Sequence, residues 1–359
     1  MKKRIYGVYK GSFLVSKAEI YIGEKENGEE FVQFSLLDIG QIHGDFDEIK
    51  NITDQEANVV LINSGTPYDV AMVLNGDKLN IHMELSEELK FDFELAKISD
   101  EADFCESYSI IPEENVDFLK ANNEYSSDEK LIDYKYEFNN PEVLVELDKR
   151  GFERVKDSSF SSIWKLFTKM CELFTQNGMS VLNPKKRGTI AKMLEADEFG
   201  SCTNCRGMSI IFAGVLRANG IKAFYEGLFS ADSDDRECHI VNEVYVEEFG
   251  KYILFDASLC SVYKLDGKYL NSVELKDAII NGRADDVVVE RCNDKKKMSN
   301  VEILSYYSKN LVHFMRCINS SESTDTTEDN TVVLSPVSAI EEYGDKGIIT
   351  TDIDNYFVA

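Results

Sequence analysis

The chain is poor in positive charge, in histidine and in long apolar runs. Its 359 residues carry 39 Lys and Arg against 65 Asp and Glu, a formal net charge of −26. Nucleic acids and anionic membranes repel such a surface, so we expect neither as a partner. The apolar stretch Ser209–Leu216 is far too short to span a bilayer. With only four histidines, the chain has few imidazoles that can serve as a general base.

The start of the chain also lacks the features of an export signal. Met1–Gly7 holds a basic cluster without a following apolar segment. Eight cysteines in a chain of this length, with no such signal, indicate reduced thiols and a cytoplasmic location. A hydrophobic content of 43% with 21 Phe excludes wholesale disorder, and the length favours about two domains.

Residues 1–100 consist of short alternating segments that are typical of strands. These segments are Phe13–Ile22, Phe31–Leu37, Val59–Ile62, Val70–Leu74, Leu79–Leu85 and Phe91–Leu95. Asn27-Gly28 and Asn75-Gly76 are strong hairpin turns between such runs. We therefore predict an antiparallel β domain, a barrel or a sandwich, that serves as a scaffold or positions a substrate.

Residues 101–145 differ in composition from both flanking regions. They are acidic and contain Pro112 and Pro141, which predicts a linker with one short helix near Val116–Ala121. Residues 146–359 are predicted to form a separate α+β domain.

The α+β domain is predicted to begin with two helices. Ser158 or Ser159 caps the first, which presents one apolar face and stops at Asn177-Gly178. The second helix covers Thr189–Leu194.

Cys205 stands at the start of a third predicted helix. Apolar residues recur after it at helical spacing, at Met208, Ile211, Phe212, Val215 and Leu216. Asn219-Gly220 is a typical helix end. The unpaired amides and the dipole of a first helical turn favour a thiolate. Because a free thiol with a pKa of about 8.5 is largely protonated at neutral pH, this position favours a reactive cysteine.

His239 and Asp256 lie on two successive predicted strands. Residues 237–246 are rich in β-formers, Phe249-Gly250 makes a turn, and residues 252–256 form the returning strand. Folding at that turn brings His239 and Asp256 to within a residue or two of facing each other. A thiol, an imidazole and a carboxylate are the groups that a cysteine acyl-transfer site needs.

The same residues resemble the transglutaminase-like superfamily, which has a papain-like fold. The likeness covers roughly residues 155–280 and lies in three blocks that follow in order: Cys205-Arg206-Gly207 with Leu216–Ile221, then His239–Tyr245, then Phe255–Ser258. Ala257 departs from the pattern, since many members have proline after the aspartate. The resemblance implies Cys205, His239 and Asp256 as catalytic residues, without a cofactor.

The expected activity is acyl transfer at an amide or peptide bond through a thioester. The resemblance leaves open whether water or an amine accepts the acyl group, and hydrolysis by a peptidase or amidase is the expected outcome. A peptide or protein is the expected substrate. The sequence does not indicate an oligomeric state.

Two alternatives stand beside this interpretation. Cys202-Thr203-Asn204-Cys205 could be a redox pair or, with Cys238, part of a structural zinc site. The fold could also serve as a non-catalytic module that binds peptides or proteins. His313, among apolar neighbours, is expected to be a packed core histidine, and Glu243 is expected at the surface.

Overall fold

The computed structural model describes most of the chain and divides it into two compact units. The described residues are 2–13, 16–36, 42–63, 66–86, 89–104, 111–127, 131–176, 188–195, 202–231, 238–293, 300–321, 328–340 and 347–358. The first unit is Met1–Ile111 with Val301–Tyr306, and the second is Pro112–Asn300 with Tyr307–Ala359. Across these ranges, no helix is both long and apolar enough to cross a membrane.

The first unit contains a nine-stranded antiparallel sheet, as the alternating segments predict. Its strands are β1 (Gly7–Phe13), β2 (Ser16–Glu24), β3 (Glu30–Leu36), β4 (Ile42–Asp45), β5 (Glu48–Ile52), β6 (Glu56–Asn63), β7 (Thr66–Asn75), β8 (Lys78–Ser86) and β9 (Leu89–Ser99). The strand order is β4-β3-β2-β1-β9-β8-β7-β6-β5. The predicted segments miss β4 and β5, which are short and carry little alternation, and they reach β1 only at Phe13.

The two ends of this sheet curl toward each other into a nearly closed barrel. The amide of Phe46 donates to the carbonyl of Val32 on β3 at 3.3 Å, and that of Asp47 donates to Val60 on β6 at 2.8 Å. Gly28 and Gly76 have φ angles of 85° and 65°, which confirms both predicted hairpin turns. Apolar side chains from alternate strand positions fill the interior.

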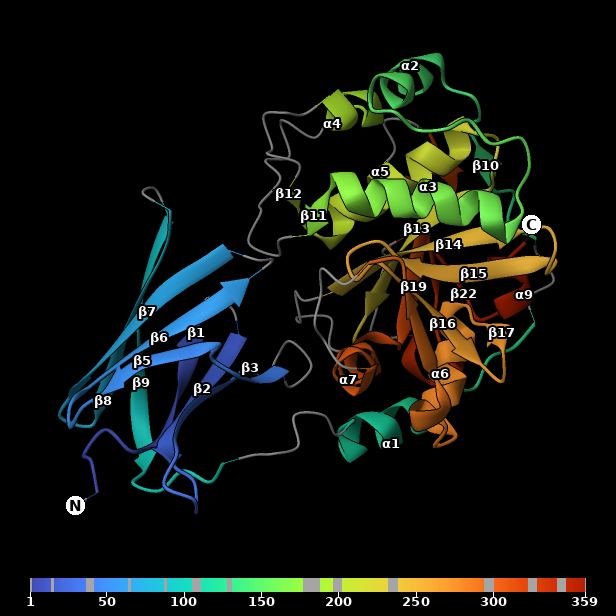
Figure 1. Ribbon diagram of the computed structural model, residues 1–359. Coiled ribbons are helices and arrows are strands. Elements are labelled where there is room, and N and C mark those ends of the chain that lie inside the picture. The colour runs from blue at the N-terminus through green and yellow to red at the C-terminus, as the bar shows by residue number, and fades with distance from the viewer. Residues whose placement is uncertain are drawn as a thin grey trace. The chain divides into compact units, whose positions relative to one another are not determined.

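The second unit is an α+β fold, which confirms the predicted fold class (Figure 1). Its helices are α1 (Glu113–Ala121), α2 (Pro141–Lys149), α3 (Phe160–Leu173), α4 (Ile190–Glu195), α5 (Cys205–Ala218), α6 (Ser272–Ile280) and α9 (Ile353–Tyr356). Helix α7 (Asn300–Asn310) is divided, because Val301–Tyr306 group with the first unit and Tyr307–Asn310 with the second. Its strands are β10 (Lys135–Tyr136), β11 (Thr175–Gln176), β12 (Cys202–Thr203), β13 (Ala223–Phe229), β14 (Cys238–Val246), β15 (Lys251–Asp256), β16 (Ser261–Leu265), β17 (Lys268–Tyr269), β18 (Val288–Arg291), β19 (His313–Cys317), β20 (Asn319–Ser320), β21 (Thr331–Leu334) and β22 (Ile348–Thr350).

The main sheet of this unit has the order β17-β16-β15-β14-β13-β19-β21-β22, with β18 paired to β16. Figure 1 shows α3 and α5 above the strands β13 to β15, and α6 below them. Ile240 and Val244 of β14 belong to the core that α5 shares. Glu243, on the alternate face, accepts the amide of Ser272 at the start of α6. The two helices therefore cover opposite faces of β14.

Residues 112–127 and 131–145, within the expected linker, belong to the second unit and pack against its other elements. Asn123 hydrogen-bonds to Asp277 of α6, and the hydroxyl groups of Tyr136 and Tyr252 lie 3.0 Å apart. The boundary between the two units falls between Ile111 and Pro112, whereas the composition predicts that the α+β domain begins near residue 146. Acidic composition marks exposed faces of α1 and α2, and it does not reveal the apolar residues, such as Leu119 and Val143, that anchor them.

Candidate active site

Cys205 is the first residue of α5, as the sequence predicts. Asn204 is the N-cap residue, and its side-chain oxygen accepts the amide of Gly207 at 3.0 Å. The helix is almost wholly buried and ends at Ala218, followed by Asn219 and by Gly220 with a φ of 79°. The Cys205 side chain is half-buried, and its own amide has no acceptor within the helix. A thiol is thereby held at the positive end of a rigid helix.

His239 and Asp256 form a buried pair. His239 Nε2 lies 2.7 Å from Asp256 Oδ2, and the two residues are only 3% and 0% exposed. The antiparallel register of β14 and β15 pairs Asn242 with Phe255. The next residue, Asp256, therefore lies opposite Val241. Val241 and His239 share a face of β14, which brings the carboxylate diagonally beside the imidazole. The sequence prediction that these residues come together is confirmed.

The thiol of Cys205 hydrogen-bonds to the same imidazole. Because Nε2 pairs with Asp256, this contact belongs to Nδ1, the other ring nitrogen. The backbone amide of Ile240 also donates to the Cys205 sulfur. Cys205, His239 and Asp256 therefore stand in a continuous hydrogen-bonded series.

The electrostatics of this series favour an ion pair. Burial alone would raise the pKa of the Cys205 thiol, but the contact with His239 lowers it below its ordinary value. Burial would lower the pKa of His239, but Asp256 and Cys205 together raise it to about 10. At neutral pH, the site consequently holds a protonated imidazole and a cysteine biased toward the thiolate.

Asp256 is fixed by donors on both of its oxygens. Oδ1 accepts the amide and the hydroxyl of Ser258 at 2.9 and 2.7 Å and the amide of Leu259 at 3.0 Å. Oδ2 accepts the hydroxyl of Tyr307 at 2.8 Å besides the contact with His239. Burial opposes ionisation, yet His239, Ser258 and Tyr307 lower the pKa of this carboxyl. The buried carboxylate thus stays charged and immobile.

Tyr307 is a member of the site that the sequence did not reveal. Its ring lies edge-on to the His239 ring, with centroids 5.3 Å apart. Its hydroxyl accepts from Tyr263, whose hydroxyl accepts from Ser261, at 3.3 and 3.0 Å. Tyr307 lies 51 residues beyond Asp256 and carries no motif, so only the fold brings the two together. This row of hydroxyls ends on Asp256 Oδ2 and helps to hold the carboxylate.

The other residues singled out in the sequence have different outcomes. His313 is fully buried in β19, as expected, and burial followed by the charge of Lys276 lowers its pKa to about 4. The expectation for Glu243 is wrong, because it is fully buried and bonded to Ser272. The Cys202 side chain lies outside the described residues, so the zinc alternative with Cys205 and Cys238 stays a prediction.

A different group of cysteines converges elsewhere in the second unit. The sulfur atoms of Cys171, Cys260 and Cys292 all lie within 4.8 Å of one another. Among the described side chains, this is the group of His, Cys, Asp and Glu that could hold a metal ion. The spacing of Cys171, Cys260 and Cys292 along the sequence gave no sign of this group.

Comparison with known proteins gives weak similarities. No family model and no curated protein matches the chain. A proposed cysteine protease from Cytophaga hutchinsonii is similar with a TM-score of 0.27 and 13% identity, over 68% of this chain and 75% of the other. A Polyporus squamosus lectin, bound to a human-type influenza-binding epitope, is similar with a TM-score of 0.20 and 10% identity, over 80% and 98% of the two chains. Because these scores are so low, the similarities support no function, and a functional proposal must rest on the geometry of the site.

Proposed function

We propose that this chain is a cysteine-dependent acyl-transfer enzyme that acts on an amide or peptide bond. The observation that carries the proposal is the hydrogen-bonded series of Cys205, His239 and Asp256 at the start of a buried helix. A half-buried sulfur beside a protonated imidazole is what nucleophilic attack on a carbonyl requires. The order of the three residues along the chain, which resembles the transglutaminase-like superfamily, supports the same activity.

The first half of the reaction forms a thioester. The Cys205 thiolate attacks the substrate carbonyl carbon, and the carbonyl oxygen becomes an oxyanion. The amide of Cys205, which has no acceptor within the helix, is the proposed first donor to that oxygen. The C–N bond then breaks, and the proton of His239 passes to the leaving amine.

The second half of the reaction returns the enzyme to its starting state. Neutral His239 removes a proton from water, the hydroxide attacks the thioester, and the acid leaves as the Cys205 thiolate re-forms. Asp256 keeps the imidazole in one orientation throughout, because four donors besides His239 hold its oxygens. We propose hydrolysis rather than transfer to an amine, since an amine must be bound to compete with water.

The proposed substrate is a peptide or protein, and the thiol chemistry needs a reducing environment such as the cytoplasm. The experiment is reaction of the purified chain with a panel of peptide amides, with and without a fluorescent primary amine, followed by mass spectrometry of products. Turnover that depends on Cys205 and yields the free acid supports a hydrolase, and amine-linked product supports a transferase. Lack of any acyl adduct on Cys205 with reactive ester substrates would contradict both forms of the proposal.

A further inference from the structure

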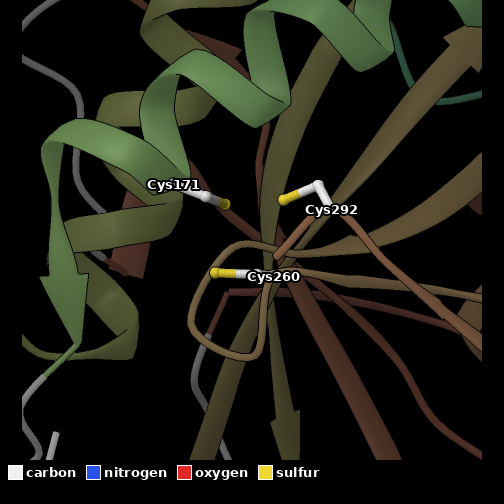
Figure 2. Close-up of side chains that lie close together, drawn as sticks. All are labelled: Cys171, Cys260 and Cys292. Atoms are coloured by element: carbon white, nitrogen blue, oxygen red, sulfur yellow. The ribbon is translucent and has the colours of Figure 1, made fainter. Parts of the chain in front are cut away.

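Three cysteines of the second unit come from separate parts of the chain to one point. Cys171 lies on α3, Cys260 in the turn between β15 and β16, and Cys292 directly after β18. Figure 2 shows the sulfur atoms of Cys171 and Cys292 turned toward each other, with that of Cys260 beside them. All three sulfurs lie within 4.8 Å of one another, without a disulfide between them.

The spacing suits a bound cation. Thiolates that share one tetrahedral or trigonal ion, at about 2.3 Å from each sulfur, lie a little under 4 Å apart. Thiolate ligands select soft metals such as Zn²⁺ and Cu⁺ over Mg²⁺ or Ca²⁺. Six cysteines with described side chains are not part of a disulfide, and three of them gather here. Independent packing of small apolar side chains gives no reason for such a gathering.

Polar groups also lie next to the three sulfurs. The thiols of Cys171 and Cys260 each donate to the carbonyl oxygen of Ala257 at 3.8 Å, and the side-chain amide of Asn293 donates to Cys292 Sγ at 3.9 Å. One carbonyl oxygen therefore lies within reach of two of the three sulfurs.

The backbone conformation and the exposure of these cysteines also suit a cation-binding site. Cys260 has a φ of 54°, a left-handed conformation that cysteine adopts rarely. Cys171 and Cys260 are buried, whereas Cys292 is half-buried and offers a route of entry. Two buried ligands and one near the surface make a preformed, reachable site.

We propose that Cys171, Cys260 and Cys292 form a binding site for a thiophilic d¹⁰ cation, Zn²⁺ or Cu⁺. Binding displaces the thiol protons and leaves three sulfur–metal bonds, with the fourth position of zinc open to the Ala257 carbonyl or to water. The site is distinct from Cys205 and does not depend on the proposed activity.

A cation bound at this site would also restrain the turn that follows Asp256. Ser258 and Leu259, which donate to Asp256 Oδ1, lie between that residue and Cys260. The amide of Cys292 donates to the Cys260 carbonyl at 3.0 Å, which ties the third ligand to the same turn. A cation held by the three sulfurs therefore restrains the backbone that positions the carboxylate.

The test is metal content and metal uptake of the reduced chain, prepared without a histidine tag. Zn²⁺ is added to one sample and Cu⁺, under anaerobic conditions, to another, and each is desalted before elemental analysis. We expect about one equivalent of one cation per chain, and protection of the three cysteines from a thiol reagent. Co²⁺ in place of Zn²⁺ should give intense sulfur-to-metal charge-transfer absorption.

Matched variants locate the site. Cys260→Ser and Cys292→Ser should lose at least about nine-tenths of the bound metal, because each removes one of only three thiolates. Cys205→Ala and Cys317→Ser, which remove thiols outside the group, should keep it. Alkylation of Cys205 reports that Cys292→Ser, at the half-buried position, remains folded. Uptake of neither cation, or loss of the metal from Cys205→Ala with retention in Cys292→Ser, would overturn the proposal.

Discussion

The second unit holds two groups of sulfur that differ in what surrounds them. Cys205 lies beside His239, whose charge is balanced by Asp256, and the sulfur is half-buried. In the other group, the nearest ionisable partners of each sulfur are two more thiols. An imidazolium makes a thiolate that can attack and be regenerated, whereas three thiols make a set of metal ligands. Neighbouring residues, rather than cysteine itself, thus decide which chemistry a sulfur supports.

The largest predicted effect follows from removal of the Cys205 sulfur, in the first of these two groups. We predict that Cys205→Ala lowers turnover of a peptide amide by at least about 10⁴-fold, because no other group can form the thioester. Cys238→Ser is the matched control, since it removes a half-buried thiol one residue from His239. Steady-state kinetics of both variants provide the measurement, and substantial turnover by Cys205→Ala would count against the assignment.

The second-largest predicted effect follows from replacement of the His239 imidazole. His239→Asn is predicted to lower turnover by about 10³-fold, because the variant loses both the proton donor and the charge that stabilises the thiolate. In the unaltered chain, turnover should rise with pH below the ordinary thiol pKa of about 8.5 and fall as pH passes the His239 pKa of about 10. A pH–rate profile checks both limbs, and the lower limb should move upward when His239 is replaced.

Removal of the metal from the three-cysteine group should lower the stability of the folded chain. With zinc at about 100-fold above its Kd, we predict a Tm about 5–10 °C higher than after chelation, since the ion binds only the folded chain. Cys292→Ser should abolish the difference, whereas Cys317→Ser should keep it. Thermal unfolding followed by circular dichroism measures the shift. An equal shift in Cys292→Ser would show that the stabilising ion binds elsewhere.

The smallest predicted effect concerns the hydroxyl that supports Asp256. Tyr307→Phe removes one donor to Oδ2 while four other hydrogen bonds to the carboxylate remain. Loss of one such bond costs about 1.5 kcal/mol, which corresponds to about a 10-fold decrease in turnover. The decrease should appear in kcat rather than KM, because Tyr307 acts through Asp256 and His239. Unchanged kcat would mean that the hydroxyl does not position the carboxylate.

Local signals in the sequence explain why much of the site could be predicted. The Asn204 cap and the Asn219-Gly220 end define α5, and the turn at Phe249-Gly250 sets the pairing of β14 with β15. Such signals act over a few residues, so they are visible in one stretch of chain. Asn271 is a local signal of the same kind, and with Glu274 it forms a capping box before α6.

The remaining features depend on contacts between distant residues. Tyr307 of α7 reaches Asp256 at the end of β15. Cys171 lies 121 residues before Cys292, with no spacing that marks them as partners. Glu243 was expected at the surface because its neighbours alternate, yet both faces of β14 are covered. Periodicity tells which residues share a face but not whether a second layer will cover it.

The central claim is most directly tested by the pH dependence of alkylation at each cysteine, resolved by mass spectrometry of peptides. Cys205 should react with iodoacetamide with a midpoint clearly below about 8.5, and His239→Asn should raise that midpoint toward the ordinary value. In the same metal-loaded sample, Cys171, Cys260 and Cys292 should stay unmodified until the metal is removed. A Cys205 midpoint near 8.5 that is unchanged by His239→Asn would contradict the claim that the imidazole activates this thiol.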